Sequence, residues 1–345
     1  MMFILMEQLY LPTPRNISYN WNFGSLLMSV LGIQIVSGFL LTLYFIGSWG
    51  DAFNCVDNLI RELNSGGFIR YIHMAGGSLM FMFFFFHIGR NLIYGWYQQI
   101  GLWFSGCLML ILGVMVGFLG YVLPWGQMSY WAATVITNFC SVIPFIGEAF
   151  VCWIWGGFSV SEPTLIRFFS LHYLCPLLIL VLVGMHIILL HENGSSNPLG
   201  ISSRGEKFFF APYYIIKDIL GISLGVGIFW LIFFYYDNIF MECQNAIEAN
   251  VLVTPPHIQP EWYYLAAYAV LRGIPNKFGG VLGLIFFVFI LAFLPFLKGF
   301  GISSKLIWWS WFINFFWLTW LGCCVVEHPF VVLSQISSIL YFLIV

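Results

Sequence analysis

The chain has 345 residues, of which 61% are hydrophobic and 8% are charged, and its mean hydropathy is +0.92. So few charged residues cannot cover a water-facing surface, which excludes a soluble globular protein and predicts an integral membrane protein. The formal net charge is only −2, so nucleic-acid binding has no electrostatic support.

Eight apolar segments predict eight transmembrane helices in an all-α fold. In chain order they are residues 24–46, 72–93, 103–122, 171–190, 219–236, 281–296, 306–326 and 331–345. The eighth would be about 22 Å long as a helix, too short to cross the hydrocarbon unaided, so we expect a partner or a thinner bilayer there. Residues 1–11 lack the basic region and the cleavage site of a secretory signal, so we expect insertion to rely on the first helix.

Charges in the connections predict the orientation. With the amino terminus on one side, basic residues outnumber acidic ones on that side, and acidic residues outnumber basic ones on the other. The positive-inside rule then places both termini on the inner face. Two long connections, residues 123–161 and 237–277, fall on the outer face, and loops of this length are usually functional. Within the first, we expect an amphipathic surface helix over residues 131–142.

Four histidines occupy matched positions in the second and fourth apolar segments. His73 and His87 are fourteen residues apart, and so are His172 and His186. Fourteen residues turn an α-helix almost four full times and rise about 21 Å, so each pair faces one side of its helix at two depths. Two such antiparallel helices would stack two bis-imidazole sites in an apolar layer about 30 Å thick. The spacing predicts one haem iron between His73 and His172 and a second between His87 and His186.

The first four helices are therefore expected to form a haem-binding four-helix bundle. This unit covers residues 1–200, including the surface loop 123–161, and a second unit covers residues 201–345, with helices five to eight and the loop 237–277. The eight cysteines form no CxxC or CxxCH pattern, which excludes a covalently attached haem. An alternative for any single histidine is a core residue satisfied by a neighbour, but the matched intervals argue against it.

Glycines and arginines near the histidines fit the same prediction. Four glycines in the first and third segments repeat the fourteen-residue interval: Gly24, Gly38, Gly106 and Gly120. A flat macrocycle could approach the backbone at these positions, although helix packing through small residues is the alternative. Three arginines lie between the histidines and the membrane faces: Arg70, Arg90 and Arg167. They could neutralise haem propionates, and interfacial snorkelling is the alternative.

Several motifs resemble the cytochrome b family, whose members form the membrane core of quinol:cytochrome c oxidoreductases. They are WNFGSLL (21–27), GYVLPWGQMSYW (120–131), ATVITN (133–138), WIWGGFSV (153–160), PPHIQPEWY (255–263) and IPNKFGGV (274–281). The resemblance spans nearly the whole chain and implies two noncovalent b-type haems and a quinone substrate. It implies a low-potential haem at His73 and His172 near the outer face and a high-potential haem at His87 and His186 near the inner face. It also implies that Trp21 contacts a haem.

The resemblance implies an outer site that oxidises quinol and passes one electron to an iron–sulfur protein and the other to the haems. Releasing protons from quinol needs a carboxylate beside a water-poor pocket, and Glu261 in the PEWY motif suits this role. The other residues implied for this pocket are Pro260, Tyr263, Tyr121, Pro124, Met128 and Ala132. Ala132 stands where glycine is common in the family, so its methyl group would narrow the pocket.

The resemblance also implies an inner site, where quinone is reduced with electrons from the haems. Reduction takes up protons, and His191 and Asp218 could supply them to opposite carbonyl oxygens of the quinone. Ser195 would lie beside them, and Lys217 would replenish the protons. From the residues alone, a loop histidine and an aspartate that caps a helix explain His191 and Asp218 equally well.

The chain offers no iron–sulfur ligand set, so partners must complete the reaction. The resemblance implies a Rieske-type iron–sulfur protein, cytochrome c1 and other complex III subunits in a homodimer, in the mitochondrial inner membrane or, alternatively, a bacterial plasma membrane. Trp96 and Ser196 depart from the family's usual serine and asparagine, which leaves the propionate contacts there open. Two other functions remain as alternatives: a dihaem reductase of another family, which should lack PEWY, and a proton-relaying transporter, which should show no haem absorbance.

Overall fold

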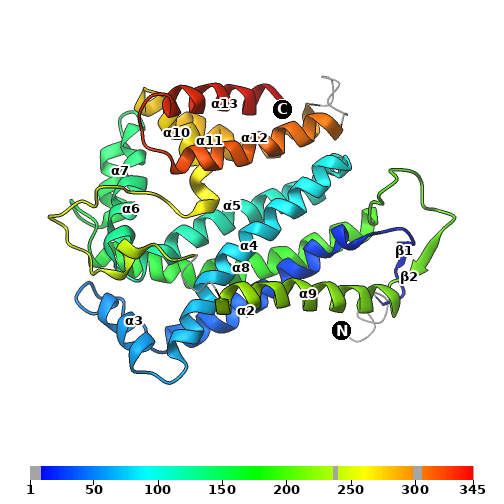
Figure 1. Cartoon of the computed structure of the whole chain (residues 1–345), viewed down its shortest axis with the longest axis horizontal. Helices are drawn as coiled ribbons and strands as arrows, with labels where there is room; N and C mark the ends of the chain where they lie inside the picture. The colour runs from blue at the N-terminus through cyan, green and yellow to red at the C-terminus, as the bar shows by residue number, and fades with distance from the viewer. Residues whose placement is uncertain (1–8, 236–239, 298–304, 345) are drawn as a thin grey trace.

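The computed structural model describes residues 9–235, 240–297 and 305–344, and helices dominate it (Figure 1). The long helices are α2 (Phe23–Thr42), α4 (Gly66–Ile93), α5 (Ile100–Val122), α8 (Glu162–Asn193), α9 (Tyr213–Tyr235), α11 (Lys277–Phe293), α12 (Lys305–Cys323) and α13 (Phe330–Ile344). They coincide with the eight apolar segments, which confirms the all-α fold class. Among the described residues, six of these helices are long and apolar enough to cross a membrane. The other two are α12, which is rich in tryptophan, and α13, which has 15 residues.

Several of these helices begin earlier than the apolar pattern indicates, and α4, α8 and α9 do so by six or more residues. Helix α4 begins at Gly66 rather than at residue 72, and α8 begins at Glu162 rather than at residue 171. A capping box starts α8, because the Ser161 backbone N–H donates to Thr164 Oγ1 at 3.1 Å. Hydropathy alone misses the polar first turn of α8, since a capping box stabilises it.

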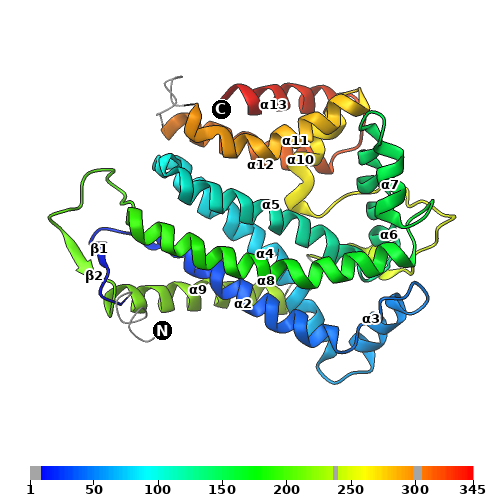
Figure 2. The same ribbon diagram turned by 180° about the vertical axis from the view of Figure 1, so that it is seen from behind.

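The first four long helices pack as two pairs, α2 against α4 and α5 against α8. At one end of the bundle lie the short helices α3 (Ala52–Arg61), α6 (Gln127–Asn138) and α7 (Gly147–Trp155), as Figures 1 and 2 show. At the opposite end, β1 (Pro12–Pro14) pairs antiparallel with β2 (Lys207–Phe209). The two ends therefore carry the connections that the charge pattern assigns to the outer and inner faces, respectively.

The predicted surface helix over residues 131–142 is wrong in its bounds and in its surroundings. Helix α6 begins at Gln127 and ends at Asn138, and a 3-10 turn, Phe139–Val142, follows it. Much of α6 is buried, because residues 240–254 cover it: Asn245 Oδ1 accepts from the Ser129 N–H at 2.8 Å, and Gln127 Nε2 donates to the Val253 carbonyl at 3.0 Å. The pattern of one segment could not reveal that a distant loop packs over it.

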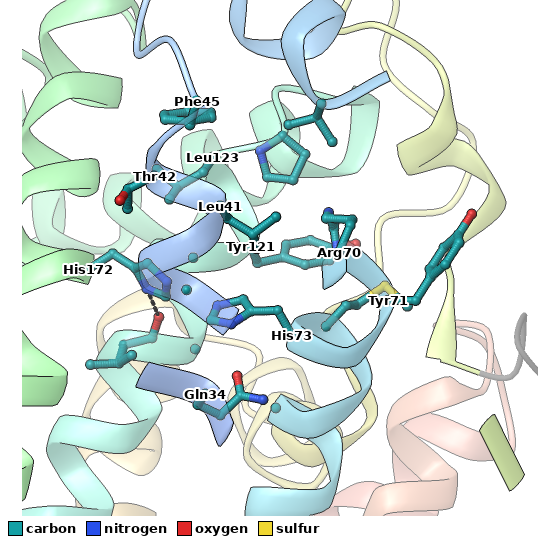
Figure 3. Close-up of a pocket in the computed structure, with 18 of the residues that line it drawn as sticks. Gln34, Leu41, Thr42, Phe45, Arg70, Tyr71, His73, Tyr121, Leu123 and His172 are labelled. Carbon is teal, nitrogen blue, oxygen red and sulfur yellow. Dashed lines mark hydrogen bonds between the residues drawn. The ribbon is translucent and has the colours of Figure 1, made fainter. Parts of the chain in front are cut away.

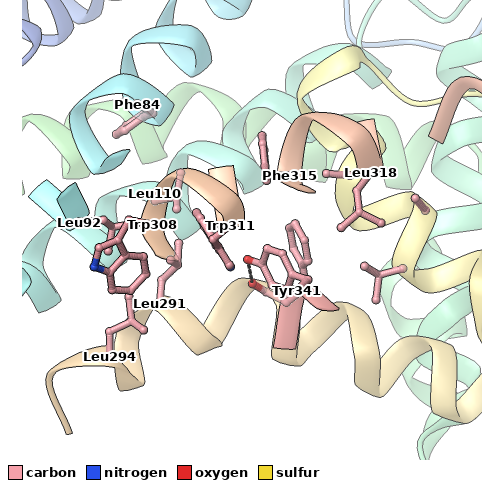
Figure 4. Packing of buried hydrophobic residues seen from close by; sticks show 14 of the residues in the cluster. Phe84, Leu92, Leu110, Leu291, Leu294, Trp308, Trp311, Phe315, Leu318 and Tyr341 are labelled. Carbon is pink, nitrogen blue, oxygen red and sulfur yellow. Dashed lines mark hydrogen bonds between the residues drawn. The ribbon is translucent and has the colours of Figure 1, made fainter. Parts of the chain in front are cut away.

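The C-terminal helices form a second core beside α4 and α5 (Figure 4). Helix α10 (Leu265–Gly273), which follows the PEWY motif, packs against α11, α12 and α13. Buried aromatic side chains hold these helices together, and the rings of Phe287 and Tyr341 stack with centroids 4.3 Å apart. The Tyr341 hydroxyl donates to the Phe287 carbonyl at 3.2 Å, so its one polar group is satisfied inside this core. The PEWY segment is thereby anchored between the bundle and the C-terminal helices.

The packing of α12 against α10 predicts that Gly322→Ala destabilises the fold. A Cβ atom at Gly322 would collide with the backbone carbonyl of Leu265, which cannot move without shifting α10. Overpacking of this kind costs about 1–3 kcal/mol, so the apparent Tm of the solubilised protein should fall in a circular-dichroism melt. The control is Gly184→Ala in α8, where no atom lies within 4 Å of the new methyl group. An unchanged Tm for Gly322→Ala would contradict this packing.

Candidate functional site

The four histidines meet in two pairs across the gap between α4 and α8. The ring centroids of His73 and His172 are 6.1 Å apart, and those of His87 and His186 are 6.4 Å apart. A metal–imidazole bond is about 2 Å long and a ring nitrogen lies about 1.1 Å from its ring centre, so two axial imidazoles on one iron have centres about 6.2 Å apart. Both separations would therefore admit one iron ion held by the two imidazoles of a pair. The pairing is the one that the fourteen-residue intervals predict.

Each histidine has a neighbour at its Nδ1 atom. Ser37 Oγ lies 3.0 Å from Nδ1 of His73, and Ser105 Oγ lies 2.7 Å from Nδ1 of His186. Nδ1 of His172 is 2.9 Å from the carbonyl oxygen of Val116. With Nδ1 occupied by the protein, Nε2 is the nitrogen available to a metal. Figure 3 shows the rings of His73 and His172 directed into a common cavity, with the hydrogen bond of His172 at its edge.

The four glycines contact the histidine rings themselves. A Cβ atom at Gly38 would lie 2.9 Å from Cε1 of His73, and one at Gly120 would overlap the ring of His172. Cβ atoms at Gly24 and Gly106 would lie 3.5 Å from Cε1 of His87 and His186, which is ordinary van der Waals contact. Each glycine thus admits one imidazole between the two helices of its pair. The structure explains the repeated interval through the imidazoles, whereas the sequence suggested contact with haem edges.

Two of the three predicted arginines lie near the histidines. Arg70 lines the cavity that holds His73 and His172. The Arg90 guanidinium carbon lies 5.1 Å from the ring centroid of Trp21, and one of its terminal nitrogens lies 3.4 Å from Nδ1 of His87. Its Nε atom is buried and has no hydrogen-bond partner among the described residues. A buried cation with an unused donor fits a ligand carboxylate.

Arg167 is placed elsewhere. Its guanidinium is exposed and donates to the carbonyl oxygens of Trp153 and Ile154, at the end of α7. The structure therefore does not bring Arg167 to the histidine pair. The sequence could not show this, because α7 and the turn that follows it were not predicted.

We call the cavity around the outer histidine pair the histidine cavity (Figure 3). Its volume is about 840 Å³, and it reaches from the two imidazoles toward the outer end of the bundle. Of the residues predicted for the outer quinol site, Tyr121, Pro124, Glu261 and Tyr263 line this cavity. Gln34, which was not predicted, also lines it, and its buried Nε2 atom has no hydrogen-bond partner among the described residues.

A second cavity, which we call the apolar cavity, adjoins the PEWY segment and has a volume of about 560 Å³. The predicted residues Pro260, Ala132 and Tyr263 line it. Tyr263 lines both cavities, and its ring stacks on Phe81 with centroids 4.0 Å apart, so the two rings form part of the wall between them. Met128 is 1% exposed and lines neither cavity. The structure thus divides the predicted outer site between two neighbouring cavities.

Glu261 lines the histidine cavity, directly after Pro260, which lines the apolar cavity. Burial, the largest cause, and the negative charge of Glu242 together raise the pKa of the Glu261 carboxyl to about 7, against the opposing effect of the positive charge of Arg70. A carboxyl with this pKa exchanges protons near neutral pH, as a general base or acid requires. Burial also raises the pKa of Tyr263 well above its usual value, so its hydroxyl remains protonated.

Two of the four residues predicted for the inner site, Lys217 and Asp218, lie against the start of α2. Lys217 Nζ donates to Asn22 Oδ1, and the Asp218 side chain hydrogen-bonds to Ser25. His191 is half-buried near the end of α8, and its Nδ1 atom has no hydrogen-bond partner among the described residues. Ser195 lies two residues beyond α8, and its neighbour Ser196 accepts a hydrogen bond from Trp21 Nε1 at 3.2 Å. Segments 19–25, 191–196 and 217–218 therefore meet at the inner end.

Sequence reasoning missed several residues of these sites. The apolar cavity is also lined by Phe118, Val135, Ile136, Tyr264 and Tyr268. They are common apolar and aromatic side chains, of which only Phe118 lies on a candidate membrane span, and only Tyr264 stands directly beside the PEWY motif. Ser37 and Ser105 each precede one of the four glycines, and this repeated Ser-Gly pair is a signal that could have identified them.

Comparison with known proteins covers almost the whole chain. Residues 8–194 match the family described as "Cytochrome b/b6/petB", and residues 248–342 match "Cytochrome b(C-terminal)/b6/petD". A protein of Apis mellifera ligustica named "Cytochrome b" is 46% identical over 99% of this chain and 90% of its own length. A chain of a solved structure titled "Hyperthermophilic respiratory Complex III" superimposes with a TM-score of 0.91 at 29% identity, covering 99% of this chain and 93% of that chain.

The glycine contacts predict that Gly120→Ala and Gly106→Ala differ sharply. The new methyl group at position 120 would overlap the His172 ring, whereas at position 106 it would only touch His186. Gly120→Ala should therefore lose most of the haem at the outer pair, and Gly106→Ala should keep both haems. Haem extraction and reduced-minus-oxidised spectra of membranes carrying each variant measure this. Equal haem content in the two variants would contradict the geometry.

Proposed function

The chain belongs to the cytochrome b family, whose members bind two b-type haems and interact with quinone, and we propose that His73 and His172 hold one haem iron and His87 and His186 the other. The chain is then the dihaem membrane subunit of a quinol:cytochrome c oxidoreductase. It oxidises quinol at the outer face and reduces quinone at the inner face. When bound, the two haems carry single electrons between these faces.

One observation supports this proposal above all others. Two imidazole pairs, with ring centres 6.1 Å and 6.4 Å apart, lie at two depths of the same bundle. Fourteen helical residues separate the pairs by about 21 Å along the bundle axis, which spans most of a hydrocarbon layer about 30 Å thick. Polar rings are costly in such a layer unless a ligand or a hydrogen bond satisfies them. A metal on each pair removes that cost at the nitrogen that the protein leaves free.

The surroundings of the histidines suit flat, anionic cofactors. We assign Arg70 to the propionates at the outer pair and Arg90, packed on Trp21, to those at the inner pair. Gly38 and Gly120 let the outer imidazoles lie against the backbones of α2 and α5. Arg167 is left out of this assignment, because its guanidinium is used by the carbonyls of α7.

At the outer face, we assign the apolar cavity to quinol and the proton-accepting role to Glu261. The walls formed by Phe118, Ile136 and Tyr268 exclude water from the quinol ring. Glu261 takes the proton of a quinol hydroxyl as a carboxylate and releases it on the side of the histidine cavity, where Arg70 and Glu242 lie. Tyr263 remains neutral and forms part of the wall between the two cavities.

At the inner face, we assign quinone reduction to the cluster of His191, Ser195, Asp218 and Lys217. Nδ1 of His191, which has no partner within residues 9–235, 240–297 and 305–344, can hydrogen-bond to a quinone carbonyl, and Asp218 lies on α9 beside Ser25. Lys217 is held by Asn22 next to that carboxyl and can pass protons to it. The two protonatable groups come from different helices, α8 and α9, as binding to opposite sides of a ring requires.

The chain works with other subunits in a membrane. We propose that these include a Rieske-type iron–sulfur protein and cytochrome c1, since the chain itself has no iron–sulfur ligands and no covalent haem motif. A homodimer of the whole complex is part of the same proposal. The location is the mitochondrial inner membrane, in line with the Apis relative, and a bacterial plasma membrane is the alternative.

His87→Leu tests the assignment of ligands. Leucine cannot ligate iron, so the variant should lose the haem of the inner pair and keep the spectrum of the outer one, with quinol:cytochrome c activity abolished. Haem extraction and low-temperature visible spectra measure the loss. The control is His191→Leu on the other histidine helix, which should keep both haems while losing quinone reduction at the inner face. Retention of two haems by His87→Leu would refute the assignment.

Glu261→Gln tests the role of the carboxyl through pH. Because its pKa is about 7, the carboxylate that accepts the proton is scarce below pH 7 and abundant above it, so quinol oxidation should rise through neutral pH. The glutamine variant should be slower by about 100-fold, the lower range for general-base catalysis, and its rate should no longer rise. Steady-state rates from pH 5.5 to 9 test this, with Glu248→Gln, an exposed residue of the same loop, as the control. An unaltered pH profile in Glu261→Gln would exclude this role.

A further inference from the structure

Two buried serines contact two of the histidines across the packed helix pairs α2–α4 and α5–α8. Ser37 on α2 is 7% exposed and lies 3.0 Å from Nδ1 of His73 on α4. Ser105 on α5 is 5% exposed and lies 2.7 Å from Nδ1 of His186 on α8. Each haem site proposed above therefore has one such serine, and each serine stands directly before a glycine that contacts the same imidazole.

Which group donates in these hydrogen bonds follows from the single proton that each serine hydroxyl carries. A serine hydroxyl has one proton, and Ser37 Oγ donates it to the Ile33 carbonyl at 2.7 Å, while Ser105 Oγ donates it to the Leu102 carbonyl at 2.8 Å. Each serine oxygen then accepts from the imidazole, so the proton of the ring resides on Nδ1. The lone pair of the neutral ring is left on Nε2, which faces the metal position.

The remaining two histidines have partners of different kinds. His172 donates from Nδ1 to the Val116 carbonyl at 2.9 Å, and a carbonyl can only accept, so this ring has the same tautomer. His87 has the donor Arg90 beside Nδ1, at 3.4 Å. The outer pair thus has two hydrogen-bond acceptors behind its imidazoles, whereas the inner pair has one acceptor and one cation.

We infer that Ser37 and Ser105 are positioning residues that fix the tautomer and the ring orientation of His73 and His186 and lower the reduction potential of the haem that each histidine ligates. A hydrogen bond donated from Nδ1–H to the serine oxygen makes the imidazole a stronger electron donor, which favours the oxidised iron. The inference rests on the proposed function, because it takes these histidines as haem ligands.

The competing explanation is local to the helices. Serine in membrane helices commonly bonds back to the carbonyl three or four residues earlier, which adjusts the helix without any ligand. If that were the whole role, replacing either serine would change stability alone. Reduction potentials and the electron paramagnetic resonance of low-spin iron separate the two explanations, because a purely structural serine would move neither.

The experiment uses Ser105→Ala and Ser37→Ala in the intact, haem-loaded protein, each variant serving as the control for the other. Redox titration followed in the visible spectrum should show a higher potential for the inner haem in Ser105→Ala, with the outer haem unchanged, and the reverse in Ser37→Ala. The expected change is about tenfold in the ratio of reduced to oxidised haem at fixed potential, or about 59 mV for a one-electron couple. Ser105→Thr and Ser37→Thr keep the hydroxyl and should restore the original potentials.

The possible outcomes are distinct. Unchanged potentials in both alanine variants, or equal shifts of both haems in either one, would overturn the inference. If Ser105→Ala loses the inner haem outright, retention of that haem by Ser105→Thr supports the inference, and its loss in both contradicts it. If the unaltered protein holds fewer than two haems, or His87→Leu keeps both, the proposed function itself fails.

Discussion

The structure depends on satisfying four imidazoles inside an apolar layer. An imidazole has two ring nitrogens, and burying either one without a partner is costly in lipid. At three of the four histidines the protein satisfies Nδ1 with a serine hydroxyl or a backbone carbonyl. The ring centres of each histidine pair lie 6.1 Å and 6.4 Å apart, separations that fit one metal ion between the two rings.

This constraint explains the arrangement of the bundle. The helices pair as α2 with α4 and α5 with α8, and glycines at the contacts allow each imidazole to lie against the neighbouring backbone. The hydrogen bonds of Ser37 and Ser105 join the same pairs. The cavity at the outer histidine pair therefore presents two imidazole rings within a lining that is mostly apolar. In the proposed assignment, the haems would satisfy the second nitrogen of each imidazole.

Much of this architecture could be predicted from the sequence, because it depends on periods that one helix displays. The fourteen-residue intervals gave the histidine pairs, and the apolar segments gave the eight long helices. Features that depend on packing between distant segments could not be predicted in this way. Three features are of this second kind. Residues 240–254 bury α6, Arg167 bonds to the end of α7 rather than lying near the histidines, and Tyr263 divides the outer site into two cavities.

The measurement that tests the central claim most directly is electron paramagnetic resonance of the oxidised, purified protein together with its haem content per chain. Two haems per chain and two distinct low-spin signals, each with bis-imidazole ligation, are the predicted result. One haem per chain, or a high-spin signal from an iron with an open axial position in the fully loaded protein, would contradict it.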